Sequence, residues 1–125
     1  MRVAVYMRCG NNDQAAEDAI QMQETALCHF AQDKGYEIAA KYHDIDIGWN
    51  MERKGLKSLL EDAASGKFEK VIATKYSRLA IGTALLMELT EQLNAVGVYA
   101  EAIHEPPLTI GELPCLYKAL CESKL

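Results

Sequence analysis

The stretch "VAVYMRCGNNDQ", residues 3–14, decides what fold to expect. Residues 2–8 form a short apolar run with β-branched and aromatic members, which is typical of a strand buried on both faces. Arg8, Cys9 and Gly10 follow this run, and polar, turn-forming residues come next. A strand that ends in an arginine and a cysteine raises the hypothesis of a phosphate-handling site.

Short strands alternate with amphipathic helices along the rest of the chain. The strands are predicted at residues 36–42, 69–75 and 98–104, and the helices at residues 15–34, 56–64 and 85–96. Gly35, Gly66 and Gly97 follow the three helices as predicted C-caps, and residues 43–50 form a predicted loop. This alternation predicts an α/β domain of three layers with a mostly parallel sheet of four or five strands.

Composition indicates a soluble globular protein. The chain has 125 residues, half of them apolar and a quarter charged. It contains no apolar run long enough for a membrane span and no secretory signal at its start, so we expect a cytoplasmic protein without a membrane partner. The four cysteines include no C-x-x-C pair and are expected to be reduced.

Charge is distributed unevenly. The net charge is −5, yet residues 53–78 hold seven basic and three acidic residues, a local charge of +4 against −9 elsewhere. A basic middle in an acidic chain suits a phosphate-bearing partner, while lysines on solvated surfaces explain it equally well.

Three arginines are predicted to converge at one edge of the sheet. Ligands of open parallel sheets bind beyond the carboxyl ends of the strands. Arg8 follows the first strand, Arg53 ends the segment after the second, and Arg78 follows the third. The planar guanidinium donates two parallel hydrogen bonds to a phosphate, so this convergence predicts an anion site.

Several other sites are excluded by the sequence. Neither the P-loop pattern nor the G-x-G-x-x-G dinucleotide fingerprint occurs. His29, His43 and His104 stand far apart, without cysteines or carboxylates at ligand spacing, so we expect no metal site and no cofactor.

A series of motifs resembles one family. The segments "YMRCGNNDQ", "QMQETAL", "DIDIGWNMERKGLKSLL", "GKFEKVIATKYSRLA" and "ELTEQLNAVGVYAEAIHE" are similar, in order and spacing, to the catalytic domain of serine site-specific recombinases, the resolvases and DNA invertases. The resemblance runs from residue 1 to about residue 105. It implies a protein of mobile elements that acts on DNA, in which a serine attacks the phosphodiester, arginines hold the phosphate and no metal takes part.

The matching positions keep the family's phosphate-binding frame. Arg8 falls on the arginine beside the nucleophile, and Gln14 falls on the glutamine four residues beyond the nucleophile. Gln23 falls on a glutamine inside the first helix. Arg53 and Arg78 fall on the arginines of the second and third motifs. The resemblance therefore implies that Arg8, Gln14, Arg53 and Arg78 contact DNA phosphate.

The departures from the family concern its chemistry. Gly10 stands where the family has its nucleophilic serine, and it has no side chain with which to attack. Ser77 replaces an aspartate, Ile81 replaces the last arginine of the third motif, and Ile47 stands where a serine is frequent. Covalent catalysis needs an activated hydroxyl or thiol, so the sequence predicts that strand cleavage is lost.

Two side chains near Gly10 remain as alternative nucleophiles for an active strand-transfer enzyme. Cys9 is adjacent, but side chains alternate along a strand, so we expect Cys9 to point to the opposite face and to be buried. Ser77 lies near the site, in a different loop.

The C-terminal residues depart from the family too. Residues 106–125 are predicted to form a short helix over 109–122, with Pro114 in its first turn, where the family has a long dimerisation helix and then a DNA-binding domain. We therefore expect no DNA-binding domain here. Leu113, Leu116 and Leu120 suit an alternative, in which an interaction or regulatory protein forms a homodimer or pairs with an intact, full-length recombinase.

Overall fold

The centre of the fold is a four-stranded sheet in which all neighbouring strands are parallel. A computed structural model describes residues 1–10, 14–45 and 53–106. The strands are β1 (Arg2–Cys9), β2 (Glu37–Ile45), β3 (Lys70–Ala73) and β4 (Tyr99–Ala102), in the spatial order β2-β1-β3-β4. The predicted α/β class and parallel sheet are confirmed.

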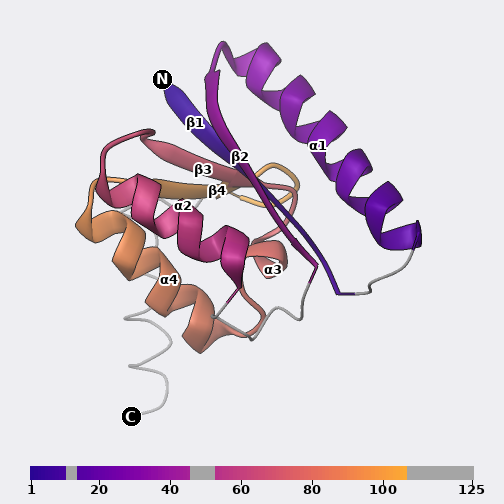
Figure 1. Ribbon diagram of the computed structural model, residues 1–125. Helices are drawn as coiled ribbons and strands as arrows, with labels where there is room; N and C mark the ends of the chain where they lie inside the picture. The colour runs from indigo at the N-terminus through magenta and orange to yellow at the C-terminus, as the bar shows by residue number, and fades with distance from the viewer. Residues whose placement is uncertain (11–13, 46–52, 107–125) are drawn as a thin grey trace.

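Helices cover both faces of the sheet, as Figure 1 shows. The helix α1 (Gln14–Lys34) packs on one face, and α2 (Lys54–Ala64) and α4 (Thr83–Ala95) pack on the other. The short helix α3 (Tyr76–Leu79) begins soon after β3. The carboxyl ends of β1, β2 and β3 therefore meet at one edge of the molecule, beside α3 and the start of α2 (Figure 1).

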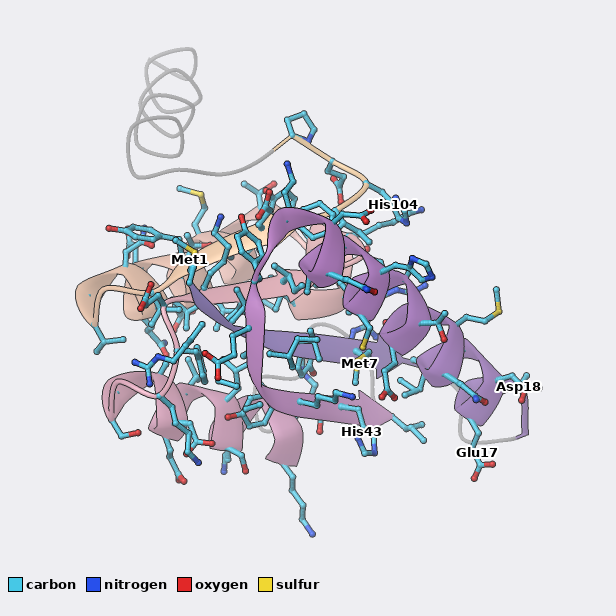
Figure 2. The ribbon with its side chains drawn as sticks, turned by 90° about the horizontal axis from the view of Figure 1, so that it is seen from above. Met1, Met7, Glu17, Asp18, His43 and His104 are labelled. Atoms are coloured by element: carbon cyan, nitrogen blue, oxygen red, sulfur yellow. The ribbon has the colours of Figure 1, made fainter. Side chains whose placement is uncertain are left out.

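The strand β1 is buried on both faces because its side chains alternate between two apolar clusters. Val5 and Met7 pack with Leu27 of α1, and Figure 2 shows Met7 between the sheet and this helix. Tyr6 packs on the opposite face in the cluster that contains Leu59 of α2. The two clusters explain why the strand reads as a continuous apolar run rather than as an alternating one.

Two differences from the predicted elements exceed the shifts of one or two residues found at other element ends. The strand β2 continues to Ile45, so residues 43–45 are not part of a loop, because Met7, Arg8 and Cys9 extend β1 far enough to pair with them. The four-residue helix α3 occupies the position of a predicted loop. Both differences arise from contacts with distant parts of the chain.

The predicted apolar stripes of the helices face the core, except for the last residue of two of them. Gly35, Gly66 and Gly97 have φ values of +72°, +80° and +80°, the left-handed conformation that glycine adopts after a helix. Ala64 is exposed and Val96 is 43% exposed, although both were predicted to belong to apolar stripes. Ala64 is the last residue of α2, and Val96 is the C-cap residue that follows α4.

The predicted helix over residues 109–122 and the position of Ile47 lie outside the described residues. Within the described ranges, no helix combines the length and the apolar character that crossing a membrane requires.

Candidate functional site

Arg8 connects the end of β1 to α3. Its side chain is only 5% exposed. Its Nε donates to the carbonyl of Arg78 at 3.1 Å, and its Nη2 donates to the carbonyl of Ser77 at 2.8 Å. In return, Nη1 of Arg78 donates to the carbonyl of Arg8 at 3.2 Å. These reciprocal bonds place Arg8 and Arg78 together, as the strand order predicts.

Gln23 of α1 holds the backbone of Arg8 from the other side. Its side-chain amide donates to the carbonyl of Arg8 at 2.9 Å and accepts from the Arg8 N–H at 3.1 Å. Gln23 is 6% exposed, so this pairing satisfies polar groups that water does not reach. Gln23, which lies within the apolar stripe of α1, thus positions Arg8 near the end of β1.

Arg53 precedes α2 and is almost completely buried, with 1% of its surface exposed. Its Nη1 donates to the Tyr6 hydroxyl at 2.9 Å and to the Arg78 carbonyl at 3.4 Å. Its Nη2 donates to the carbonyl of Leu79. Arg8 and Arg53 thus bind the same short segment, and the three predicted arginines lie in one cluster, here called the arginine cluster (Arg8, Arg53 and Arg78).

Asp44 connects β2 to both Tyr6 and α2. Its Oδ2 accepts from the Tyr6 hydroxyl at 2.7 Å and from the Leu56 N–H at 2.9 Å. Its Oδ1 accepts from the Gly55 N–H at 2.7 Å. The carboxylate therefore caps the first turn of α2, whose N–H groups have no partner within the helix.

Gly55 allows this close approach between α2 and β2. A Cβ at position 55 would lie 2.4 Å from the carbonyl oxygen of His43 and 2.8 Å from Oδ2 of Asp44. Sequence reasoning did not identify the bridge from Tyr6 to Asp44. The available signal was a tyrosine two residues before Arg8 and an aspartate near the end of the paired strand.

The electrostatics of the cluster follow from burial and from like charges. Burial, followed by the positive charges of Arg53 and Arg78, lowers the pKa of Arg8. Burial and the hydrogen bond to Asp44 raise the pKa of Tyr6, so the phenol keeps its proton and donates it to the carboxylate. The cluster therefore concentrates positive charge at the carboxyl edge of the sheet.

Arg78 is the arginine of the cluster with the greatest access to solvent. Its side chain is partly exposed, whereas Arg8 and Arg53 are buried. The Nε of Arg78 is itself buried and has no hydrogen-bond partner among the described residues. A ligand therefore meets the exposed part of the Arg78 side chain before it meets this nitrogen.

Gly10 lies immediately after β1 and is exposed. A Cβ built there has no heavy atom of the described residues within 4 Å, so among these residues the position has room for a side chain and carries none. Ser77 is exposed on α3, close enough to Arg8 for its own carbonyl to accept a hydrogen bond. The expectation of a buried Cys9 is wrong, because the strand ends there and Cys9 is only partly buried.

Four other residues singled out in the sequence are Gln14, Ile81, His43 and His104. Gln14 is the first residue of α1, and its side chain lies outside the described residues. Ile81 is 38% exposed. His43 and His104 are exposed and lie well apart in Figure 2. Across the described ranges, no three potential metal-ligating side chains gather.

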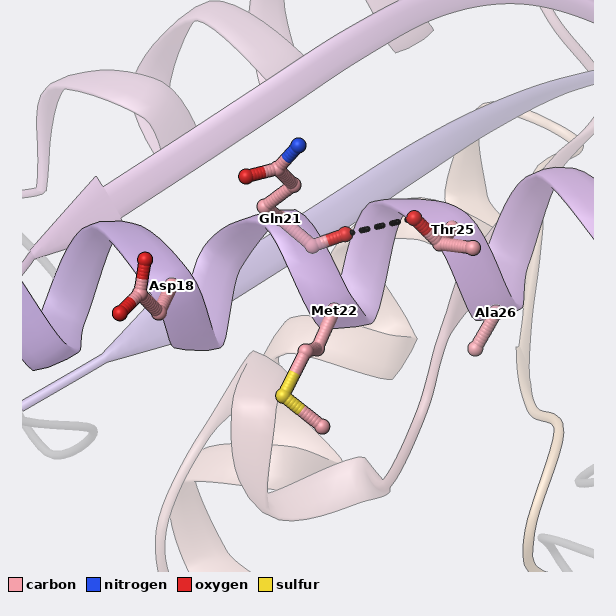
Figure 3. Close-up of a pocket in the computed structure, with 5 residues that line it drawn as sticks. All are labelled: Asp18, Gln21, Met22, Thr25 and Ala26. Atoms are coloured by element: carbon pink, nitrogen blue, oxygen red, sulfur yellow. Dashed lines mark hydrogen bonds between the residues drawn. The ribbon is translucent and has the colours of Figure 1, made fainter.

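A pocket lies away from the arginine cluster, on α1. Asp18, Gln21, Met22, Thr25 and Ala26 line it, and Figure 3 shows them along this one helix. The hydroxyl of Thr25 donates to the backbone carbonyl of Gln21 at 3.0 Å, and Met22 is 74% exposed. The described lining thus offers no group of side chains suited to catalysis.

Comparison with solved structures finds the same fold. The C-terminal catalytic domain of ISC1926 TnpA, an IS607-like serine recombinase, is 27% identical, with a TM-score of 0.76 over 96% of this chain and 78% of that one. The N-terminal catalytic domain of TP901-1 integrase is 23% identical, with a TM-score of 0.88 over 99% and 96%. A resolvase family site-specific recombinase from Streptococcus pneumoniae is 21% identical, with a TM-score of 0.80 over 99% and 87%.

Family comparison agrees with the fold and with the motifs. The family described as "Resolvase, N terminal domain" matches residues 3–110, which include every described strand and helix except the first residue of β1. The chain belongs to this resolvase family.

Proposed function

We propose that this protein binds the phosphate backbone of DNA through its arginine cluster and does not cleave the strand. The observation that carries the proposal is the convergence of Arg8, Arg53 and Arg78 beside Gly10, a position with room for a nucleophile and no side chain. Guanidinium groups bind phosphate without any covalent step. Phosphate binding therefore survives where phosphoryl transfer does not.

Membership of the resolvase family supports DNA as the source of the phosphate. Structural relatives with this fold are described as an IS607-like serine recombinase and as a resolvase family site-specific recombinase. The basic segment of residues 53–78 begins with Arg53 and ends with Arg78, two members of the cluster, and carries a charge of +4 in an otherwise acidic chain.

Incubation with supercoiled plasmid tests the absence of cleavage. We expect no nicked or linear DNA and no covalent protein–DNA adduct on a denaturing gel, while fluorescence anisotropy with a labelled duplex detects salt-dependent binding. Cleavage by the unmodified protein would overturn the proposal. Absence of any salt-dependent binding would also overturn the proposal, because the arginine cluster would then not bind the DNA backbone.

Ser77 gives a second candidate function, strand transfer with an alternative nucleophile. It is exposed on α3, and its backbone carbonyl accepts a hydrogen bond from Arg8, so Ser77 lies beside the arginine cluster. An adduct that Ser77→Ala abolishes and Cys9→Ala leaves intact would support this candidate. The reverse pattern would assign the reaction to Cys9.

Partners of the chain are tested separately. Self-association and pairing with a full-length recombinase remain predictions, and Leu113, Leu116 and Leu120 lie outside the described residues. Light scattering measures the first, and a pull-down against a purified full-length recombinase measures the second. A monomer that captures no recombinase contradicts both.

A further inference from the structure

The short helix α3 is held at both ends by distant parts of the chain. At its start, the Tyr76 N–H donates to the Glu105 carboxylate at 2.8 Å, and the Tyr76 hydroxyl donates to the Pro106 carbonyl at 2.8 Å. At its end, Arg8 and Arg53 bind three successive carbonyls, those of residues 77, 78 and 79. A helix of one turn has little stability of its own, so these contacts keep it in place.

The contacts of Arg8 use the edge of the guanidinium that suits a phosphate. Its Nε and Nη2 form the pair of parallel donors that grips two oxygens of a phosphate or carboxylate. Both donors are directed at backbone carbonyls, of Arg78 at 3.1 Å and of Ser77 at 2.8 Å. The carbonyls of α3 therefore occupy the place that two phosphate oxygens would take.

We propose that α3 is an internal competitor of phosphate for the donors of the arginine cluster, so that loosening α3 increases affinity for DNA. This inference rests on the proposed function, because it takes the arginine cluster as the DNA-phosphate site. The end of a helix carries a partial negative charge, which makes it a natural occupant of a cationic site. A phosphate carries a full charge and displaces it when α3 can move away.

An alternative role of α3 predicts a change in DNA affinity of the opposite sign. If α3 instead holds the arginines in the geometry that binds phosphate, loosening it lowers affinity. The sign of one affinity change therefore separates competition from preorganisation.

Tyr76→Phe is the variant that loosens α3 without a change of charge. It removes the hydroxyl that donates to Pro106 and keeps the ring, which is buried. Tyr42→Phe is the matched control, because it removes one hydroxyl, which donates to Asp62 instead. With a labelled duplex at fixed salt, we expect Tyr76→Phe to bind about two- to tenfold more tightly than the unmodified protein, the range that one hydrogen bond spans. Equal or weaker binding overturns the inference.

Glu105→Ala is a second variant, because it removes the acceptor of the Tyr76 N–H. Glu91→Ala removes the same charge at an exposed position of α4 and is its control. We expect tighter DNA binding in the first and a smaller change in the second. An equal gain in both would show that charge, and not α3, governs affinity.

Chemical modification of Arg8 gives a readout that needs no DNA. Phenylglyoxal reacts with accessible guanidinium groups, and peptide mass spectrometry locates the product. We expect faster modification of Arg8 in Tyr76→Phe than in the unmodified protein or in Tyr42→Phe. Faster modification with no DNA binding in any variant would reject the proposed function, and with it DNA as the competitor of α3, while showing that α3 shields Arg8. Salt-dependent DNA binding with unchanged modification and affinity would reject the inference and keep the proposed function.

Discussion

Gln23 and Arg8 exchange two hydrogen bonds between a side-chain amide and a backbone peptide group, at 2.9 and 3.1 Å. Through this pairing α1 fixes the residue at which the central strand meets the arginine cluster. The contact lies inside an otherwise apolar interface, where an unpaired polar group costs more than a lost surface hydrogen bond.

Gln23→Ala is expected to destabilise the protein by about 1–3 kcal/mol, because it removes the side-chain acceptor of the buried Arg8 N–H. Urea denaturation measures the change. Gln21→Ala is the control on the same helix, since Gln21 is exposed, and it should stay within about 0.5 kcal/mol of the unmodified protein. Equal effects of the two substitutions would contradict this role of Gln23.

Gly55→Ala is predicted to destabilise the protein, although alanine is normally the better helix former by about 1 kcal/mol. The new Cβ would lie 2.4 Å from the carbonyl oxygen of His43, and relief of such a contact costs about 1–3 kcal/mol. Thermal or urea unfolding gives the sign directly. Gly10→Ala provides the comparison, because a Cβ at position 10 meets no heavy atom of the described part of the chain within 4 Å. A stabilised Gly55→Ala variant would show that α2 does not approach β2 this closely.

The hydrogen bond from Tyr42 to Asp62 predicts a pH-dependent contribution to stability. This bond, together with the charge of Lys67, lowers the pKa of Asp62 below its ordinary value of 3.8. A carboxyl whose pKa is lower in the folded state stabilises the protein above the unfolded-state pKa, and the contribution disappears as pH falls through the folded-state value. The stability difference between the unmodified protein and Tyr42→Phe should therefore shrink on acidification below 3.8. A difference that grows on acidification would contradict the assignment.

Gly10→Ser tests whether the residues around position 10 can support strand cleavage once a hydroxyl is present there. The side chain has room, so we expect stability within about 0.5 kcal/mol of the unmodified protein. We predict that the new hydroxyl alone does not restore cleavage, because Ile81 stands where the resemblance implies an arginine clamp. A plasmid assay with detection of covalent adducts measures this. An adduct with Gly10→Ser would show that the remaining residues suffice.

The sequence predicts those parts of the fold that depend on local pattern. The apolar run of β1 and the stripes of the three long helices specify a parallel sheet covered on both faces. The convergence of Arg8, Arg53 and Arg78 follows from the rule that parallel strands end at one edge. Only the resemblance to a family singled out Gln23, because a polar residue within an apolar stripe does not by itself indicate a role.

Tertiary contacts explain what the sequence did not predict. The helix α3 is one turn long and depends on Arg8, Arg53 and Glu105, which are distant in sequence, so no local pattern marks it. The last residues of β2 are polar or exposed, and only pairing with β1 makes them a strand. The Tyr6 to Asp44 hydrogen bond joins two strands and is likewise invisible to periodicity.

The salt dependence of DNA binding in Arg78→Ala tests the central claim, that the arginine cluster holds the phosphate backbone. Arg78 is partly exposed, whereas Arg8 and Arg53 are buried, so Arg78 is the arginine of the cluster best placed to meet DNA. We predict weaker binding and a plot of log K against log salt whose slope is smaller by about one, the loss of one phosphate contact. Lys34→Ala removes one charge from the end of α1 and should keep the slope. Unchanged affinity and slope in Arg78→Ala would contradict the claim.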